Sequence, residues 1–280
     1  MGSVLNMGFV AIEATVGFVS GSTALLADAG HNLGDVAALL AAWGAATLAK
    51  RGRSERFTWG LRSASILAPL FNAVVLLVVT GAIAAEAGRR LLHPVAAPGL
   101  TVAAVALAGV FVNGGTAFLF AGGRKDDVNR RAVFLHMASD AVVSAGVAGA
   151  GVLMWFTGWL WLDPLASLAV SALIIVASLD LFRDTAVMAL AAVPPGVDPV
   201  AVRAWLEGRP GVERVHDLHI WPVGSTDTAL SCHLVMPQGA PGDAFLGETT
   251  RELNARFSIG HASLQVETDA ACACPFEEAA

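Results

Sequence analysis

Two copies of one short motif, a histidine followed four residues later by an aspartate, lie in long apolar stretches of the sequence. The first copy is His31 and Asp35, and the second is His136 and Asp140. Residues four apart project from one face of an α-helix. An ionisable group inside an apolar span is costly enough to indicate a function. Two imidazoles and two carboxylates form a nitrogen and oxygen ligand set that suits tetrahedral Zn²⁺.

A second interpretation of this quartet is two independent hydrogen-bonded pairs that pack helices together. One such motif would carry little weight, whereas two copies in two apolar segments favour a metal site. Imidazole must be neutral to bind a metal, so metal and protons compete for it, and histidine titrates near pH 6.5 in model peptides. A site that binds either Zn²⁺ or protons, and opens to each side in turn, has the outline of an antiporter.

The composition predicts a membrane domain followed by a small soluble one. Of the 280 residues, 55% are hydrophobic and only 14% are charged, against about 25% charged residues in an ordinary soluble domain. Charges are sparse up to Val193 and dense afterwards. Six segments offer the roughly 20 apolar residues that a membrane-spanning helix needs. They run over about 3–25, 27–49, 63–92, 100–121, 132–157 and from Asp163 to about 181. We therefore expect a six-helix membrane domain over 1–193, with its first segment retained as a span.

Loop charges predict the orientation of the spans. The loops over 50–56 and 124–131 are strongly basic, while the loops on the other side carry few Lys or Arg residues. Because basic loops face the cytoplasm, both termini should be cytoplasmic, in a multi-pass protein of a bacterial inner (plasma) membrane. We expect Asp163, followed by Pro164, to cap the sixth helix, and Pro69 to kink the third.

Residues 194–280 predict a small cytoplasmic α+β domain. A helix over 198–207 capped by Asp198 is followed by strands over 212–221 and 228–236, a helix over 244–257 and a strand over 263–267. This αββαβ order gives a two-layer domain. Residues from Ala270 onward are expected to lack structure.

Four polar residues in the spans have two interpretations each. Asp28 lies one turn before His31 and is either a helix cap or a carboxylate that passes metal or protons to the site. Glu13, Asn72 and Asn113 either form hydrogen bonds between helices or support the ligands and line a water path.

The C-terminal domain offers candidates for a second metal site. His216 and His233 lie on neighbouring strands, with Glu267 on the third strand, Asp269 just after it and His261 just before it. These side chains either gather around a metal or are exposed polar strand residues. Cys272 and Cys274 are either a soft-metal clip or part of an inert tail. The net charge of −6 argues against a nucleic-acid partner.

At the two His-x-x-x-Asp motifs the chain resembles the cation diffusion facilitator family. The runs over 25–31, 215–221 and 264–267 are similar to its zinc-exporting branch, which includes bacterial zinc, cobalt and cadmium efflux proteins and animal zinc transporters. The resemblance implies a homodimer with six spans per protomer, Zn²⁺/H⁺ antiport, and a cytoplasmic metallochaperone-like domain that dimerises and can sense metal. Histidine at the first motif position, here His31, is associated in that family with a preference for zinc over cadmium.

Two departures from that family bear on the sites. Some members build a metal site from Asp and His in the loop between the second and third spans, but residues 50–62 contain neither. Some members place a bridging histidine in the last strand, where this chain has Glu267.

The function predicted from the sequence is therefore a secondary transporter that exports Zn²⁺ by proton exchange, and not an enzyme. Asp35 and Asp140 would supply oxygen ligands, and His31 and His136 nitrogen ligands. The alternatives are a membrane-anchored metal sensor without transport, a channel, and an intramembrane metallohydrolase, for which the sequence lacks an H-E-x-x-H motif.

Overall fold

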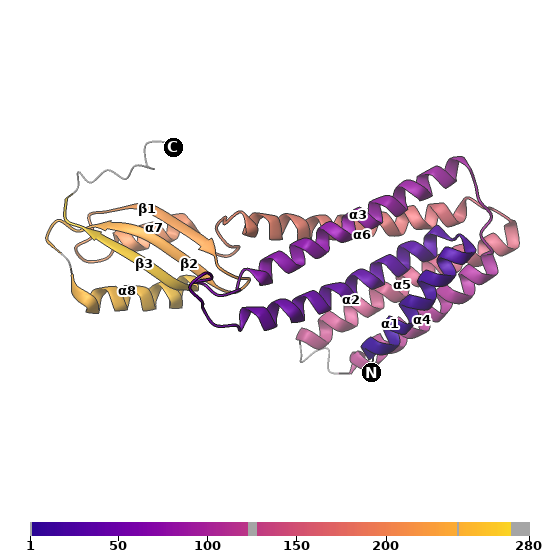
Figure 1. The fold of residues 1–280 in the computed structure, drawn as a ribbon, viewed down its shortest axis with the longest axis horizontal. Coiled ribbons are helices and arrows are strands. Elements are labelled where there is room, and N and C mark those ends of the chain that lie inside the picture. Colours follow the sequence, from indigo (N-terminus) through magenta and orange to yellow (C-terminus); the bar gives the residue numbers. More distant parts are fainter. Residues whose placement is uncertain (1, 123–127, 240, 270–280) are drawn as a thin grey trace. The chain divides into compact units, whose positions relative to one another are not determined.

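The computed structural model describes residues 2–122, 128–239 and 241–269. Six long helices precede a small domain of two helices and three strands (Figure 1). The six are α1 (Gly2–Ser20), α2 (Thr23–Ala49), α3 (Ala64–Leu92), α4 (Gly99–Ala121), α5 (Val128–Thr157) and α6 (Leu162–Ala189). Helices α2 to α6 are long and apolar enough to cross a membrane, while α1 contributes the shorter apolar stretch Met7–Ser20. The expected class, apolar helices followed by a small α+β domain, is confirmed. The predictions for residues from Ala270 onward, including Cys272 and Cys274, lie outside the described residues.

The chain divides into two compact units. The first comprises Met1–Ala41 and Phe71–Phe182, and the second comprises Ala42–Leu70 and Arg183–Ala280. Helices α2, α3 and α6 therefore each belong partly to one unit and partly to the other. Pro69 lies inside α3, close to the point where the division falls.

Within the first unit, α4 and α5 approach each other at two glycines. A Cβ atom on Gly99 would lie 2.7 Å from the carbonyl oxygen of Gly151, and one on Gly151 would lie 2.6 Å from the backbone nitrogen of Ala103. Small residues allow such backbone contact between helices in membranes. The buried core beside this contact includes Leu25, Val102 and Val147.

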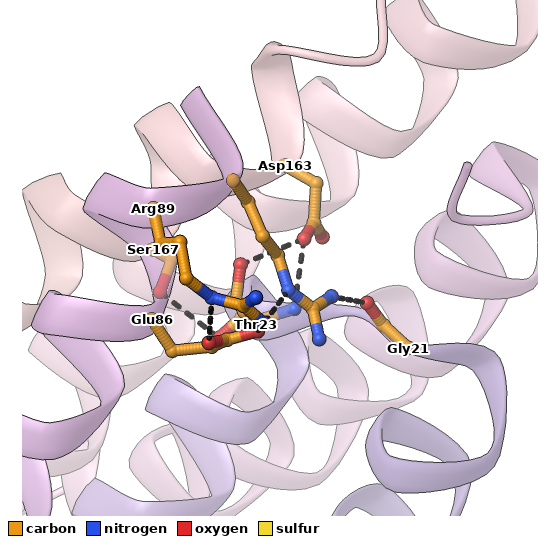
Figure 2. A network of polar contacts seen from close by, with 7 residues as sticks. Gly21, Thr23, Glu86, Arg89, Asp163 and Ser167 are labelled. Carbon is orange, nitrogen blue, oxygen red and sulfur yellow. Dashed lines mark hydrogen bonds and ion pairs between the residues drawn. The ribbon is translucent and has the colours of Figure 1, made fainter. Parts of the chain in front are cut away.

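A polar network joins the α1–α2 turn to α3 and α6 (Figure 2). The Asp163 carboxylate accepts hydrogen bonds from the backbone N–H of Thr23 (2.7 Å), from the Thr23 hydroxyl (2.8 Å) and from the Ser22 hydroxyl. Ser167 donates to the carbonyl of Thr23, and Arg90 donates to that of Gly21. The prediction that Asp163 caps α6 is wrong, because α6 begins at Leu162 and the Asp163 carboxylate accepts from the free N–H of Thr23 at the start of α2 instead. The expected first span is also too long, since α1 ends at Ser20.

Within the second unit, three strands form one sheet in the order β1–β2–β3. Strand β1 (Arg214–Pro222) pairs antiparallel with β2 (Thr228–Val235), which pairs parallel with β3 (Ile259–Glu267). Helices α7 (Pro199–Glu207) and α8 (Gly242–Phe257) pack on the sheet around a core that includes Leu206, Leu230, Cys232 and Leu253. Asp198 caps α7 as predicted, and the αββαβ order is confirmed.

The segment that precedes α3 contacts the β1–β2 turn of the same unit. Arg62 forms an ion pair of 2.9 Å with Asp227, and Ser63 donates a hydrogen bond to the carbonyl of Val223. The backbone N–H of Ser225 donates to the Ser65 hydroxyl. These contacts join residues about 160 positions apart in the sequence.

Candidate metal centre

The two His-x-x-x-Asp motifs meet where α2 lies beside α5. His31 Nε2 is 3.4 Å from Asp140 Oδ1, and His136 Nε2 is 3.2 Å from Asp35 Oδ2. Within each helix the histidine nitrogen is 3.8 Å (α2) or 3.7 Å (α5) from the aspartate of its own motif. The i,i+4 spacing stacks each pair on one helix face, and the contact between the helices brings the two pairs together.

These separations match the requirements of a tetrahedral ion. Ligand atoms at 2.0–2.1 Å from Zn²⁺ lie about 3.4 Å from one another across a tetrahedral edge. The four measured nitrogen–oxygen separations bracket that value. Ligand atoms of His31, Asp35 and Asp140 can all be chosen within 4.8 Å of one another. These three residues can therefore hold a metal ion, and His136 lies beside them but outside this group of close ligand atoms.

Several polar atoms of the quartet have no hydrogen-bond partner. Oδ2 of Asp35, Oδ2 of Asp140 and Nδ1 of His31 are buried and unpaired in hydrogen bonds. A buried, unsatisfied carboxylate oxygen is costly, and a bound cation removes that cost at both aspartates. The side chain of Asp140 is 3% exposed and that of His136 is 45% exposed, so the quartet is closed on one side and accessible on the other.

A glycine next to Asp35 allows α3 to approach α2 at the level of the quartet. A Cβ atom on Gly34 would lie 2.9 Å from a methyl carbon of Leu76. One turn earlier, a Cβ on Gly30 would meet Ile83 at 3.5 Å. The glycines in the motif region thus serve packing, while His31 and Asp35 face α5.

A second polar group lies toward the start of α2. The Ser144 hydroxyl donates a hydrogen bond of 2.8 Å to Asp28, and the Asn32 amide donates one of 3.4 Å to Glu13. Asp28 and Glu13 are fully buried, Asn113 on α4 is 1% exposed and Asn72 on α3 is 9% exposed. Asp28 lies six positions inside α2, so it does not cap the helix, and interhelical hydrogen bonding accounts for the contacts of Glu13 and Asp28.

The C-terminal domain brings three of its predicted residues together. His216 Nε2 lies 2.8 Å from one carboxylate oxygen of Glu267, and His233 Nδ1 lies 2.9 Å from the other. The two rings are 5.0 Å apart. The hydrogen bond from His216 lowers the pKa of the Glu267 carboxyl. Ligand atoms of these three residues lie within 4.8 Å of one another, so they can hold a metal ion.

Two residues predicted for this site, His261 and Asp269, are not in the cluster. One neighbour of the cluster, Asp217, was not predicted. The ring of His261 packs edge-on against Trp59 at 4.8 Å. Asp269 follows β3 two residues beyond Glu267 and is outside the group of close ligand atoms. Asp217, which was not predicted, places a carboxylate oxygen 3.6 Å from His233 Nε2. Its backbone has a φ of 49° and lies where the β1–β2 register shifts, and strand alternation gives no signal for such a turn.

Comparisons with known proteins cover both parts of the chain. Residues 1–188 match the family model described as the cation efflux transmembrane domain, and residues 194–269 match that of the cation efflux protein cytoplasmic domain. The chain is 33% identical over 272 residues to a cadmium, cobalt and zinc/H(+)-K(+) antiporter of Bacillus subtilis, covering 95% of this chain and 87% of the relative. It is 34% identical over 265 residues to the zinc transporter ZitB of Escherichia coli, covering 94% and 84%. It is 31% identical over 260 residues to the metal cation efflux system protein CzcD of Cupriavidus metallidurans, covering 92% and 82%.

Proposed function

Because the chain belongs to the cation efflux family, in its zinc-exporting branch, we propose that it exports Zn²⁺ from the cytosol in exchange for protons. Other divalent cations that accept imidazole and carboxylate ligands are further substrates. The observation that carries the proposal is the quartet of His31, Asp35, His136 and Asp140, whose nitrogen–oxygen separations of 3.2–3.8 Å suit one tetrahedral ion. The names of relatives that transport zinc, cadmium and cobalt support the choice of cargo.

The roles of the four ligands follow from their chemistry. Asp35 and Asp140 supply anionic oxygens, which offset most of the ion's charge in an apolar span. His31 and His136 supply nitrogens only while neutral, so a falling pH on one side expels the ion there. Alternating access around a site inside the membrane couples these two events.

We also propose where the two domains lie in the cell. We place the domain boundary after Val193, so that 1–193 spans the lipid bilayer and 194–280 lies in the cytoplasm with the N-terminus. We propose a bacterial plasma membrane, because several of the similar transporters come from bacteria. The match to the cytoplasmic dimerisation domain of the family supports a homodimer.

The cluster of His216, His233 and Glu267 is proposed as a regulatory zinc site. Its support is the close approach of three ligand atoms within 4.8 Å. A sensor without transport finds no support in the comparisons, which point to transporters throughout.

Flux in proteoliposomes tests the proposal. Wild-type protein with an imposed pH gradient should drive zinc uphill, and Asp140→Ala should abolish this flux. His31→Asp should admit Cd²⁺ if this position sets metal preference. Asp180→Asn, which removes an exposed acid from α6, is the matched control and should transport normally. Gradient-independent flux in wild type, or intact flux in Asp140→Ala, would contradict the proposal.

A further inference from the structure

A pair of buried carboxyl groups lies next to the metal quartet without belonging to it. Glu13 on α1 and Asp28 on α2 are both 0% exposed. One oxygen of each carboxyl group accepts a hydrogen bond, because Asn32 donates to Glu13 Oε2 and Ser144 donates to Asp28 Oδ2. The remaining oxygens, Glu13 Oε1 and Asp28 Oδ1, are buried and accept no hydrogen bond from a described residue.

The two carboxyl groups are neighbours, because the Asn32 amide that donates to Glu13 lies one helical turn after Asp28 on α2. An electrostatic interaction links Glu13 to Asp28. Two ionised carboxylates are acceptors only, so neither can satisfy the free oxygen of the other unless one of them carries a proton. Two negative charges side by side in an apolar interior are also strongly unfavourable. Among the described residues no Lys or Arg forms an ion pair with either group. The arrangement therefore calls for one proton held between Glu13 and Asp28.

The charged groups that face this pair belong to the metal quartet. Asp28 lies one helical turn before His31 on α2, and electrostatic interactions link it to His31 and to Asp140 on α5. It accepts a hydrogen bond from Ser144 and is outside the group of close ligand atoms, so it is a neighbour of the ligands and not one of them. A divalent cation in the quartet makes the electrostatic potential at Asp28 more positive, which favours the ionised carboxylate.

We propose that Glu13 and Asp28 form a proton-binding site that holds one proton when the quartet is empty and releases it when the metal binds. The inference rests on the proposed metal–proton exchange and names a carrier for one exchanged proton besides the histidines. In the step itself, one carboxyl O–H bond breaks and the proton passes to water on the side toward which the transporter is open. By linkage, protonation of the pair weakens metal binding to the same extent that metal weakens proton binding.

The variants Glu13→Gln and Asp28→Asn test the inference. Each amide keeps the size and the hydrogen-bonding capacity of the acid but cannot release a proton, so a merely structural role would survive both changes. Asp180→Asn is the matched control from an exposed position of α6.

Two readouts are measured on the full-length protein. Infrared spectroscopy of metal-free protein should show a protonated-carboxyl band that disappears on Zn²⁺ addition and is missing in Glu13→Gln and Asp28→Asn. Vesicles with entrapped pH and zinc dyes should show the number of protons moved per Zn²⁺ falling by about one in both variants, as expected if the linked group is lost. Asp180→Asn should match wild type in both readouts.

Different experimental results would contradict the inference and the proposed function. If wild type moves no protons with zinc, the proposed exchange is wrong and the inference falls with it. If wild type couples the two but both amide variants keep the wild-type proton count, only the inference is overturned. Absence of the carboxyl band from wild type at neutral pH overturns it as well. If one variant does not fold, the other decides.

Discussion

The carboxylate of Asp163 lies 2.7 Å from the backbone nitrogen of Thr23, although the two residues are 140 positions apart. This contact caps α2, the helix that carries His31 and Asp35, from the first turn of α6. The position of half of the metal quartet along the bundle is therefore fixed by a residue that is not near it.

Removing this distant cap should destabilise the membrane domain. Asp163→Ala leaves a buried N–H group and two hydroxyl groups without an acceptor, which should cost about 2–4 kcal/mol. The measurement is thermal unfolding in detergent. Asp198→Ala, at the exposed cap of α7, is the control and should cost only about 1 kcal/mol. Equal losses from the two variants would argue against the role given to Asp163.

The glycine contact between α4 and α5 gives a second prediction. Gly151→Ala places a methyl group 2.6 Å from the backbone of Ala103, so the helices must separate at a cost of about 1–3 kcal/mol. Because α5 carries His136 and Asp140, zinc affinity should fall together with stability. Gly146→Ala and Gly149→Ala, on the same helix with no atom within 4 Å, should be neutral or stabilising by up to about 1 kcal/mol. Unchanged stability and zinc binding in Gly151→Ala would contradict this account.

The buried thiol of Cys232 predicts a pH dependence of the cytoplasmic domain. Burial raises the pKa of this thiol from 9.0 to about 12. Between these values the unfolded chain loses the thiol proton and the folded domain keeps it, so stability falls with rising pH by about 1.4 kcal/mol per unit. Below pH 9 the thiol has no effect on this dependence.

Thiol alkylation measures this behaviour directly. In a Cys272→Ser, Cys274→Ser background, iodoacetamide at pH 8 should leave Cys232 unlabelled until denaturant unfolds the domain. Cys232→Ala in the same background should flatten the decline in stability above pH 9. Rapid labelling of the folded protein at pH 8 would show that the thiol is accessible and ionised.

The cytoplasmic cluster predicts a second zinc-binding event. Calorimetric titration of the full chain should detect two zinc ions per protomer, of which Asp140→Ala removes one and His216→Ala or Glu267→Gln removes the other. Zinc at 100 times the dissociation constant should stabilise the cytoplasmic domain by about 2.7 kcal/mol. This gain should diminish on acidification, because protons compete with the metal for its ligands. His261→Ala should retain both events, because His261 contacts Trp59 instead.

The sequence predicted those parts of the fold that depend on local patterns. The spacing of His31 and Asp35, repeated in His136 and Asp140, was sufficient to anticipate the four-residue cluster, since helix geometry alone places each pair on one face. Apolar length predicted the spans, and Asp198 before Pro199 predicted the start of α7. Whether the quartet carries metal stays a prediction.

What the sequence could not predict depends on contacts between distant segments. A capping residue has the same sequence pattern whether it caps its own helix or a distant one, so Asp163 was predicted to cap α6. His261 was expected just before the last strand, as a candidate ligand beside His233. However, β3 begins at Ile259, and His261 pairs with Ala229, four positions along β2 from His233. Strand alternation would place the Asp217 side chain on the face of the sheet opposite to His216. The positive φ of Asp217 turns the side chain away from that expected direction.

The nitrogen–oxygen separations in the quartet are of two kinds, those within one helix and those between α2 and α5. The two kinds respond differently when the helices shift. The separations within each motif are set by one turn of helix, whereas the His31–Asp140 and His136–Asp35 separations change with the spacing of α2 and α5. Helices in switching proteins commonly shift by about 1–2 Å. A shift of that size lengthens both cross-helix edges and leaves both within-helix edges unchanged, splitting one four-ligand cage into two bidentate halves. An ion bound by all four side chains would thus depend on a single distance, the separation of α2 from α5.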